Sequence, residues 1–269
     1  MVNSVLVWWD EQAAGATNMG ADEALVAEAV ARGMLLVRLY GWQPAAVSLG
    51  AFQRLDDAQQ CSGIASLPMV RRPSGGGAII HGSDLTYAAA VPKHHPWGSS
   101  PQRLYDAFHG AMVETLASWR IVASLHPAVG PAAPPAASVQ EPFLCFDRRA
   151  VGDVVMPDRR RGREQAAPAK VMGSAQRRLE GAVLQHGSLL LTANAAASGS
   201  AQHPGMRELA GDGVEIPAVR DLVSRWLELV ATSLGVKVAV QTGSFAGTAR
   251  SEVDRLAQRF GQVRWTARR

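Results

Sequence analysis

Three consecutive glycines, Gly75 to Gly77, are the feature that most restricts how this chain can fold. Each glycine gives up the burial of a side chain and costs backbone entropy on folding, so packing alone does not explain the run. Such a run suits a backbone with φ > 0 or the close approach of a ligand to the main chain. We therefore expect a flexible cradle of main-chain groups, flanked by Arg71, Arg72 and His81.

The glycine segment admits a simpler interpretation as well. It could be the turn of a hairpin that joins strands over 69–72 and 79–81. No Gly-Lys-Ser/Thr follows it and it lacks the Gly-x-Gly-x-x-Gly context of a dinucleotide fold, so it does not establish a nucleotide site. The flanking charges favour binding, whereas a structural, hydrogen-bonding role is slightly favoured for His81 itself.

Two further segments carry a thiol and an amine. Cys145 lies in Phe143-Leu144-Cys145-Phe146, and Lys170 opens a segment that continues through Gly173 and Ser174. A cysteine among apolar residues is usually buried and inert, and an acyl-transferring thiol needs a nearby cation or base. Lys170 can be that neighbour if two adjacent strands bring it to Cys145. The thiol, the lysine and the cradle together suit the transfer of an acyl group between a thioester and an amine.

Small and polar residues extend this candidate site. Gly173 and Ser174 would let a substrate carbonyl approach main-chain N–H groups that stabilise an oxyanion. Gln185 and His186 lie in Gln185-His186-Gly187-Ser188, where His186 has either a structural or a binding role. Lysines such as Lys170 are more often solvated surface residues, so the chemistry depends on these segments meeting.

Composition limits the class of protein. The chain has 269 residues, 47% hydrophobic and 19% charged, and no apolar run reaches the roughly 18 residues of a membrane span. Its first residues lack the basic start of a signal peptide, so we expect a cytoplasmic protein. Cys61 and Cys145 have no metal-ligand spacing, which argues against zinc or a disulfide. A net charge of +4 suits an acidic protein partner and does not imply nucleic acid.

Hydrophobic periodicity predicts a mixture of helices and strands. Asn18 opens a helix that Gly33 ends, and Ser100 with Pro101 starts the clearest helix, whose apolar residues recur every four positions. We expect one catalytic domain over residues 1–269, with mobile surface loops near 127–142 and 157–168. Strands are expected over 4–9, 34–42, 46–52, 85–91, 151–156, 171–177 and 182–191, and two closing helices over 218–234 and 249–260.

Taken in order, these segments resemble the lipoate and biotin protein ligase-like superfamily, and within it the octanoyltransferases of the LipM type. The resemblance spans most of the chain, and the ordered series is specific. It is carried by Asn18-Met19 with Asp22-Glu23, Arg38-Leu39-Tyr40-Gly41-Trp42, Ser48-Leu49-Gly50, the Arg71–Gly77 segment, Cys145-Phe146, the Lys170–Gln176 segment and Gln185-His186-Gly187-Ser188.

The resemblance implies an α/β (α+β) fold of mixed sheets and helices that encloses a tunnel for an acyl chain. It implies an acyltransferase, a lipoyl(octanoyl) transferase, that takes octanoyl from octanoyl-acyl carrier protein and gives it to a lysine of a lipoyl domain such as glycine cleavage H protein. Neither cofactor nor metal is implied. Cys145 and Lys170 would be catalytic, and the substrate would contact Arg72, Ser74, Gly75, Gly76, Gly77, His81, Gly173, Ser174, Gln185 and His186.

The chain departs from that family in the active region. Asp147-Arg148-Arg149 follows Cys-Phe where the family carries Pro-Ser, the loop before Lys170 is longer than usual, and Gly82 follows His81 where many relatives carry aspartate. The arginines at 159–161 and 163 lack interleaved aromatic residues, so we interpret them as a solvated loop that helps dock the acidic carrier protein, not nucleic acid.

Three other functions stay open at this point. An ATP-dependent lipoate-protein ligase would share the glycine segment and Lys170 but would need no cysteine. An amidotransferase that moves octanoyl between lipoyl domains would also use Cys145. A non-catalytic relative would only bind acyl groups or lipoyl domains.

Overall fold

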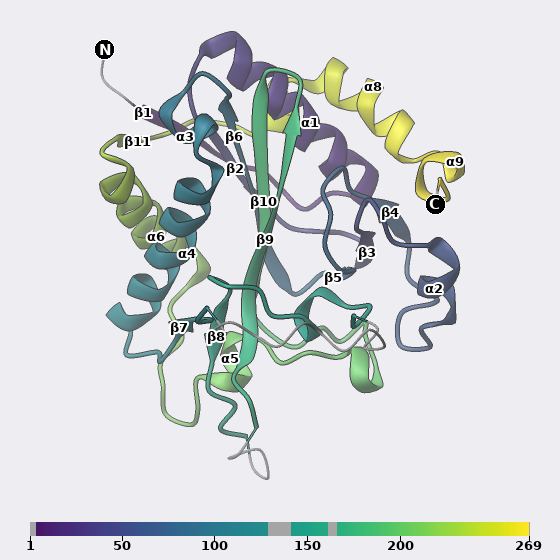
Figure 1. Cartoon of the computed structure of the whole chain (residues 1–269), viewed down its shortest axis with the longest axis vertical. Helices are drawn as coiled ribbons and strands as arrows, with labels where there is room; N and C mark the ends of the chain where they lie inside the picture. Colours follow the sequence, from purple (N-terminus) through teal and green to yellow (C-terminus); the bar gives the residue numbers. More distant parts are fainter. Residues whose placement is uncertain (1–3, 129–140, 161–165, 269) are drawn as a thin grey trace.

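The computed structural model describes residues 4–128, 141–160 and 166–268. Within them the chain forms a mixed α/β fold, with one large sheet between two layers of helices and a small sheet beside it (Figure 1). The strands are β1 Ser4–Trp9, β2 Leu36–Tyr40, β3 Ala46–Leu49, β4 Met69–Arg71, β5 Ile79–His81, β6 Asp84–Pro92, β7 Ser124–Leu125, β8 Val154–Met156, β9 Ala169–Leu179, β10 Ala182–Leu190 and β11 Lys237–Val240. The helices are α1 Gly15–Arg32, α2 Leu55–Gln60, α3 Pro96–Ser99, α4 Pro101–Ser118, α5 Met206–Leu209, α6 Val219–Leu234, α7 Phe245–Thr248, α8 Arg250–Phe260 and α9 Val263–Thr266, with 3-10 turns η1 Cys145–Asp147 and η2 Gly199–Ala201.

The large sheet is mixed in strand direction. Over the described ranges its order is β11-β1-β2-β6-β10-β9-β8-β7. β1 runs parallel to β2 and β11, whereas the strands from β2 across to β7 pair antiparallel. β9 and β10 form the long hairpin at the centre of Figure 1, which turns at Gly181 with φ +77°. Their register places Gly173 opposite Ser188 and Ser174 opposite Gly187, so the lysine segment and the Gln-His-Gly-Ser segment lie side by side.

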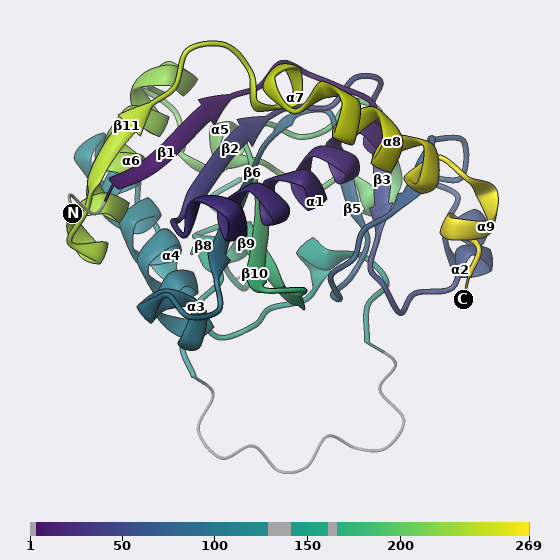
Figure 2. The same ribbon diagram turned by 90° about the horizontal axis from the view of Figure 1, so that it is seen from above.

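Alternating side chains of the sheet pack against different helices (Figures 1 and 2). In β2, Val37 and Leu39 belong to the apolar cluster formed with α4 and α6. Leu36 and Tyr40 belong to the cluster formed with α1 and α8. This two-residue period is what a strand buried on both faces produces.

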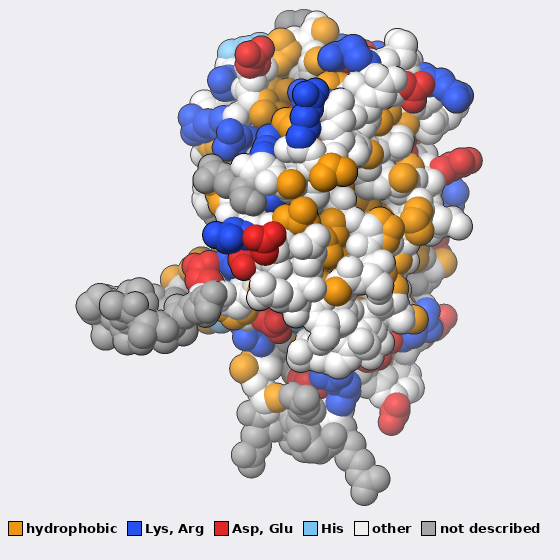
Figure 3. Space-filling model, turned by 90° about the vertical axis from the view of Figure 1, so that its right-hand side faces the viewer, with side chains coloured by type: hydrophobic (Ala, Val, Ile, Leu, Met, Phe, Trp, Pro, Cys, Tyr) orange, Lys and Arg blue, Asp and Glu red, His pale blue; other side chains and the backbone are white. Residues whose placement is uncertain are grey.

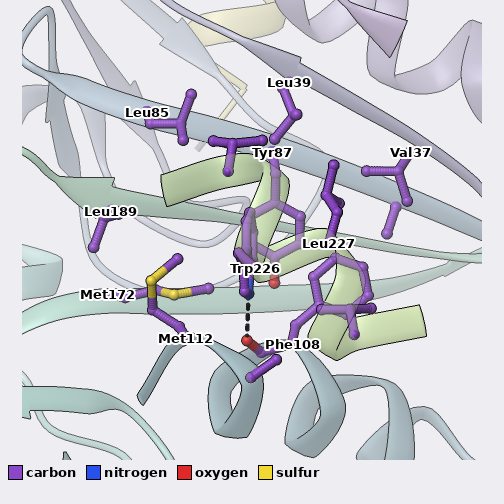
Figure 4. Packing of buried hydrophobic residues seen from close by; sticks show 14 of the residues in the cluster. Val37, Leu39, Leu85, Tyr87, Phe108, Met112, Met172, Leu189, Trp226 and Leu227 are labelled. Atoms are coloured by element: carbon purple, nitrogen blue, oxygen red, sulfur yellow. Dashed lines mark hydrogen bonds between the residues drawn. The ribbon is translucent and has the colours of Figure 1, made fainter. Parts of the chain in front are cut away.

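Aromatic rings fill the layer between the sheet and helices α4 and α6 (Figure 4). Trp226 of α6 meets Tyr87 of β6 edge to face, with ring centroids 5.1 Å apart, and Phe108 of α4 in the same way at 5.6 Å. Its indole N–H donates to the Phe108 carbonyl over 2.8 Å, so the polar atom is satisfied inside the core.

The small sheet corrects one expectation. β4 and β5, the strands on either side of the glycine segment, do not pair with each other. β3 lies between them, parallel to β4 and antiparallel to β5. The glycine segment therefore crosses the end of β3, and the hairpin interpretation is wrong.

The long helices follow their predicted periodicity closely. α4 begins at Pro101 and buries Leu104, Phe108, Met112 and Leu116, as predicted, although the Ser100 side chain makes no capping bond. α1 ends at Gly33, whose φ of +68° is the left-handed cap. It begins at Gly15, three residues before Asn18, and the Asn18 side-chain amide donates to the carbonyls of Ala13 and Gly41.

The strands differ mainly at their ends. β2, β3 and β8 are shorter than expected, and β9 runs on to Leu179. The strands β7 and β11 and the short helices α2, α3, α5, α7 and α9 were not predicted. Parts of both predicted loops, 129–140 and 161–165, lie outside the described residues, as do Arg161 and Arg163. None of the helices in the described part of the chain is long and apolar enough to cross a membrane.

Candidate active site

The thiol of Cys145 is held by the backbone of the glycine segment. Ala78 N–H donates to the Phe143 carbonyl over 3.0 Å, and Cys145 N–H donates to the Ala78 carbonyl over 2.8 Å. A Cβ on Gly77 would lie 2.7 Å from the Cys145 nitrogen, so a side chain at that position would push the cysteine away. Cys145 is free and partly exposed, and it lies in the turn η1, just after the segment 127–142 that we expected to be a loop.

Lys170 reaches this thiol from β9. Its Nζ lies 3.6 Å from Cys145 Sγ and 2.9 Å from Asp153 Oδ2, and only 5% of the lysine side chain is exposed. The lysine stem lies across Gly173, where a Cβ would come within 2.3 Å of Lys170 Cε. The surface interpretation of Lys170 is therefore wrong, and the missing side chain of Gly173 leaves room for the lysine stem.

A cavity of about 250 Å³ opens beside the thiol. This volume is close to the lower end of the ~300–1,000 Å³ found for small-molecule sites. Among the described residues its wall includes the cations Arg72, Arg148, Arg149 and Lys170. Nine of the predicted site residues line it: Arg72, Gly76, Gly77, His81, Cys145, Lys170, Gly173, Ser174 and His186.

Three predicted substrate residues are not part of the cavity wall. Ser74 is fully buried, and its hydroxyl bonds to His186 Nε2. A Cβ on Gly75 would lie 3.6 Å from the exposed ring of Phe52, and the Gly75 carbonyl accepts from Arg72 over 2.8 Å. Gln185 is buried, donates to the Tyr87 hydroxyl over 2.6 Å and accepts from the Gln176 amide over 2.6 Å. Their contacts support the residues that do line the cavity.

The buried side chain of Arg72 holds the glycine segment in place through hydrogen bonds to its carbonyl groups. Its guanidinium donates to the carbonyls of Ser48, Gly75 and Gly77 at 2.7, 2.8 and 2.7 Å. Burial lowers the pKa of Arg72 to about 10, an effect that the Cys145 thiol opposes and Arg148 reinforces. Arg72 still carries its charge at neutral pH, so it places a buried cation at the cavity wall.

The two predicted histidines are both fixed by carboxylates. His81 stacks on Trp42 with ring centroids 3.8 Å apart and bonds Ser48 Oγ and Asp84 Oδ2, each at 2.8 Å. Burial alone would raise the pKa of Asp84, but His81 and two further hydrogen bonds outweigh it and lower that pKa. These contacts agree with the structural role favoured for His81.

His186 joins the cavity to a buried charge network. Its Nδ1 lies 3.0 Å from Asp22 Oδ2, which also accepts from the Tyr40 hydroxyl over 2.9 Å. Asp22 Oδ1 pairs with the buried Arg38 at 2.7 Å, and Arg38 pairs with Asp10 at 2.9 Å. The ring of His186 is therefore held in one orientation at the cavity wall.

Several residues of the site were missed by sequence reasoning. Asp153 contacts Lys170, and the Tyr105 hydroxyl donates to Asp153 Oδ1 over 2.9 Å. Ser174 Oγ lies 2.7 Å from both the Tyr87 hydroxyl and His109 Nε2. Burial lowers the pKa of His109 to about 4, against the hydrogen bond to the Gly152 carbonyl, so the ring is neutral beside Ser174.

The site does not suggest a metal centre. In residues 4–128, 141–160 and 166–268 no group of three or more His, Cys, Asp or Glu side chains is placed to hold a metal ion. The chemistry that the described groups can perform is that of a thiol beside an ammonium group, next to a cavity with main-chain and arginine donors.

Comparisons of the sequence with a family model and with individual proteins point to the same family. The lipoyl protein ligase A/B catalytic domain matches residues 14–224. Octanoyltransferase LipM of Anoxybacillus flavithermus is 33% identical over 183 residues, which cover 65% of this chain and 61% of that protein. Octanoyltransferase LipM of Bacillus subtilis is 32% identical over 185 residues, which cover 66% of this chain and 62% of that protein. The matched part thus spans about three fifths of the length of these relatives.

Solved structures share the fold at lower identity. Protein Ta0514 of T. acidophilum with bound lipoic acid matches with a TM-score of 0.65 at 17% identity, over 99% of this chain and 100% of that one. Lipoate-protein ligase A bound with ATP matches with a TM-score of 0.63 at 18% identity, over 99% of each chain. These likenesses confirm the predicted mixed α/β fold of the lipoate ligase type.

Proposed function

Since the chain belongs to the lipoyl protein ligase A/B catalytic domain family, we propose that it is an octanoyltransferase that works through a thioester on Cys145. The donor is octanoyl-acyl carrier protein, and the acceptor is a lysine of a lipoyl domain such as glycine cleavage H protein. The observation that carries the proposal is the 3.6 Å contact between Lys170 Nζ and Cys145 Sγ at the cavity wall. Relatives named octanoyltransferase support the choice of acyl group.

In the first half-reaction the Cys145 thiolate attacks the thioester carbonyl of the donor. A carbon–sulfur bond to Cys145 forms, the bond to the carrier sulfur breaks, and the carrier leaves as a thiolate that takes up a proton. The Lys170 ammonium stabilises the attacking thiolate and donates a hydrogen bond toward the leaving sulfur or the carbonyl oxygen. Arg72 adds positive charge at the same wall.

In the second half-reaction the ε-amine of the acceptor lysine attacks the octanoyl-cysteine. An amide bond forms, the amine loses a proton, and Cys145 leaves as the thiolate that Lys170 again stabilises. The balance is one thioester and one amine consumed, and one amide and one thiol formed. The thioester supplies the driving force, so this reaction needs no ATP.

The cavity gives a place for the acyl chain. Met19, Ile79, Ala150 and Ala175 supply apolar surface to its wall. An octanoyl group carries seven carbons beyond the carbonyl, and at about 0.8 kcal/mol per buried carbon their burial is worth roughly 6 kcal/mol. We infer that this cavity is the mouth of the acyl tunnel implied by the family resemblance.

The surface charge fits an acidic partner. Lys and Arg side chains gather on the upper part of the face shown in Figure 3. Complementary charge of this kind speeds the encounter with an acidic protein such as an acyl carrier protein. We place the reaction in the cytoplasm.

The test is intact-protein mass spectrometry after mixing the protein with octanoyl-acyl carrier protein in the absence of ATP. Wild type should gain one octanoyl group, which an apo lipoyl domain should then remove. Cys145→Ala should gain none. Cys61→Ala is the matched control, because Cys61 is the other free cysteine and packs beside the small sheet, outside the cavity wall.

Other outcomes would replace the proposal. Modification of the lipoyl domain only when ATP and free octanoate or lipoate are supplied would indicate a lipoate-protein ligase. No adduct from octanoyl-acyl carrier protein, together with transfer of octanoyl from an octanoylated lipoyl domain to an apo lipoyl domain, would indicate an amidotransferase. Ligand binding by Cys145→Ala without turnover by wild type would indicate a binding protein.

A further inference from the structure

We propose that Asp153 is a positioning residue, which holds the Lys170 ammonium against Cys145 so that the carboxylate, amine and thiol act as one linked set. The inference rests on the proposed function for the reaction that the set serves. It extends the cysteine and lysine pair by a residue that the sequence did not reveal.

The geometry is that of a lysine fixed between two partners. Lys170 Nζ lies 2.9 Å from Asp153 Oδ2 and 3.6 Å from Cys145 Sγ, and 5.7 Å from the centre of the Phe146 ring. The side chains of Lys170 and Asp153 are 5% and 1% exposed. A lysine stem has four flexible carbons, so a second partner is needed to keep its ammonium beside the thiol.

Asp153 is itself fixed by groups that do not take part in the reaction. The Tyr105 hydroxyl donates to Oδ1 over 2.9 Å, and Ala150 N–H donates to Oδ2 over 2.6 Å. Gly152 has φ +84°, and a Cβ there would lie 2.9 Å from Tyr105 Cε1. The glycine therefore makes room for the tyrosine to reach the carboxylate, so the turn before β8 is shaped around Asp153.

Asp153 is the counterion of Lys170, because the other acid in the cavity wall has a different partner. Among the described residues that line the cavity, the acids are Asp153 and Glu141, and Glu141 pairs with Arg148. Without an anion beside it, a buried ammonium tends to lose its proton or move toward water. Either change would remove the positive charge that the Cys145 thiolate needs.

Other titratable groups also face the set. Tyr105 and His109 approach it from α4, and burial first, then the Asp153 carboxylate, raises the pKa of Tyr105 so that its hydroxyl keeps its proton. Arg72 and Arg148 approach the thiol from the glycine segment and from beyond η1. The test must therefore compare variants at Asp153 with a variant at Lys170 itself.

The experiment measures the rate of Cys145 alkylation by iodoacetamide against pH, in a Cys61→Ala background that leaves one thiol. Lys170→Met should move the midpoint of the alkylation profile upward by about one pH unit, because the cation is gone. Asp153→Asn should move it in the same direction by a similar amount, because the lysine no longer lies beside the sulfur. Asp158→Asn is the matched control, a buried acid near β8 that pairs with Arg160 and should leave the midpoint unchanged.

A second readout follows the reaction. The rate constant for octanoyl-Cys145 formation should fall about 10- to 100-fold in Asp153→Asn with the KM for the donor unchanged. An Asp153→Asn midpoint that stays in place or falls while that of Lys170→Met rises would overturn the proposal. A Lys170→Met midpoint that does not rise would overturn it as well.

Two features keep the test decisive. If Asp153→Asn does not fold, Tyr105→Phe takes its place, because it removes only the hydrogen bond to Asp153 Oδ1. It should raise the alkylation midpoint by a smaller amount, and an unchanged midpoint would count against the proposal. The alkylation profile needs no acyl donor, so it reports on Asp153 even if octanoyl-acyl carrier protein proves not to be the substrate.

Discussion

Replacing Gly173 with alanine should disable the site while leaving the chain folded. Gly173 lies in β9 opposite Ser188, where an alanine suits the backbone. Its Cβ, however, would lie 2.3 Å from Lys170 Cε and 2.5 Å from Nζ, whereas ordinary contact begins near 3.4 Å. The lysine must therefore move by about 1 Å, the difference between 3.4 and 2.3 Å. That movement breaks the alignment of its ammonium with Cys145.

A misplacement of about 1 Å at a reacting group can cost roughly 100-fold in rate. At 1.36 kcal/mol per factor of ten, this is about 2.7 kcal/mol of transition-state stabilisation. The assay is rapid-quench mass spectrometry of octanoyl-Cys145 at saturating donor, with thermal unfolding to verify the fold. Gly110→Ala is the matched control, because a Cβ there meets nothing within 4 Å inside α4 and should stabilise the helix by about 0.5–1 kcal/mol. Acylation of Gly173→Ala at the wild-type rate would refute the reasoning.

Three further outcomes are expected. Because burial lowers the pKa of His109 to about 4, the unfolded chain binds the extra proton first on acidification, so stability is lost as pH falls from about 6.5 to 4. Urea titrations should show that the free energy of unfolding of wild type falls by about 2 kcal/mol between pH 7 and 4.5, and that His109→Gln lacks this loss. An equal dependence of the free energy of unfolding on pH in both proteins would contradict this. Arg38→Met leaves Asp10 and Asp22 buried without their cation and should lower the free energy of unfolding by about 3–5 kcal/mol, whereas a loss below about 1 kcal/mol would show that the network tolerates the change. Ala175→Leu should shorten the preferred acyl chain, with each excluded methylene costing about 0.8 kcal/mol, or roughly fourfold in kcat/KM; an unchanged ratio of hexanoyl to octanoyl transfer would place the chain elsewhere.

The helices and most strands could be predicted because their signals are local. The apolar residues of α4 recur along one face, and Gly33 ends α1 through its own backbone conformation. The pairing of β4 and β5 could not be predicted in this way. Proximity in sequence suggested a hairpin, but β3 pairs with both strands, and that competition is decided by packing in three dimensions.

The candidate site shows the same limit. Cys145 and Lys170 were found because a cysteine, and a lysine followed by small residues, together suggest acyl transfer. Asp153 was not found, because an acid after Gly152 looks like an ordinary turn residue. Its role depends on Tyr105, which comes from a helix 48 residues earlier in the chain. No local pattern records such a contact.

The glycine segment has a physical reason in addition to the expected approach of a ligand. At Gly77 the crowding atoms belong to the backbone of Cys145, and main-chain bonds through Ala78 complete the contact. The position of the thiol is thus set by neutral main-chain groups, whereas its charge environment is set by Lys170 and, through it, by Asp153. Because different parts of the chain supply position and charge, a change at Gly77 should displace the sulfur, and a change at Asp153 should alter its reactivity with the sulfur still in place.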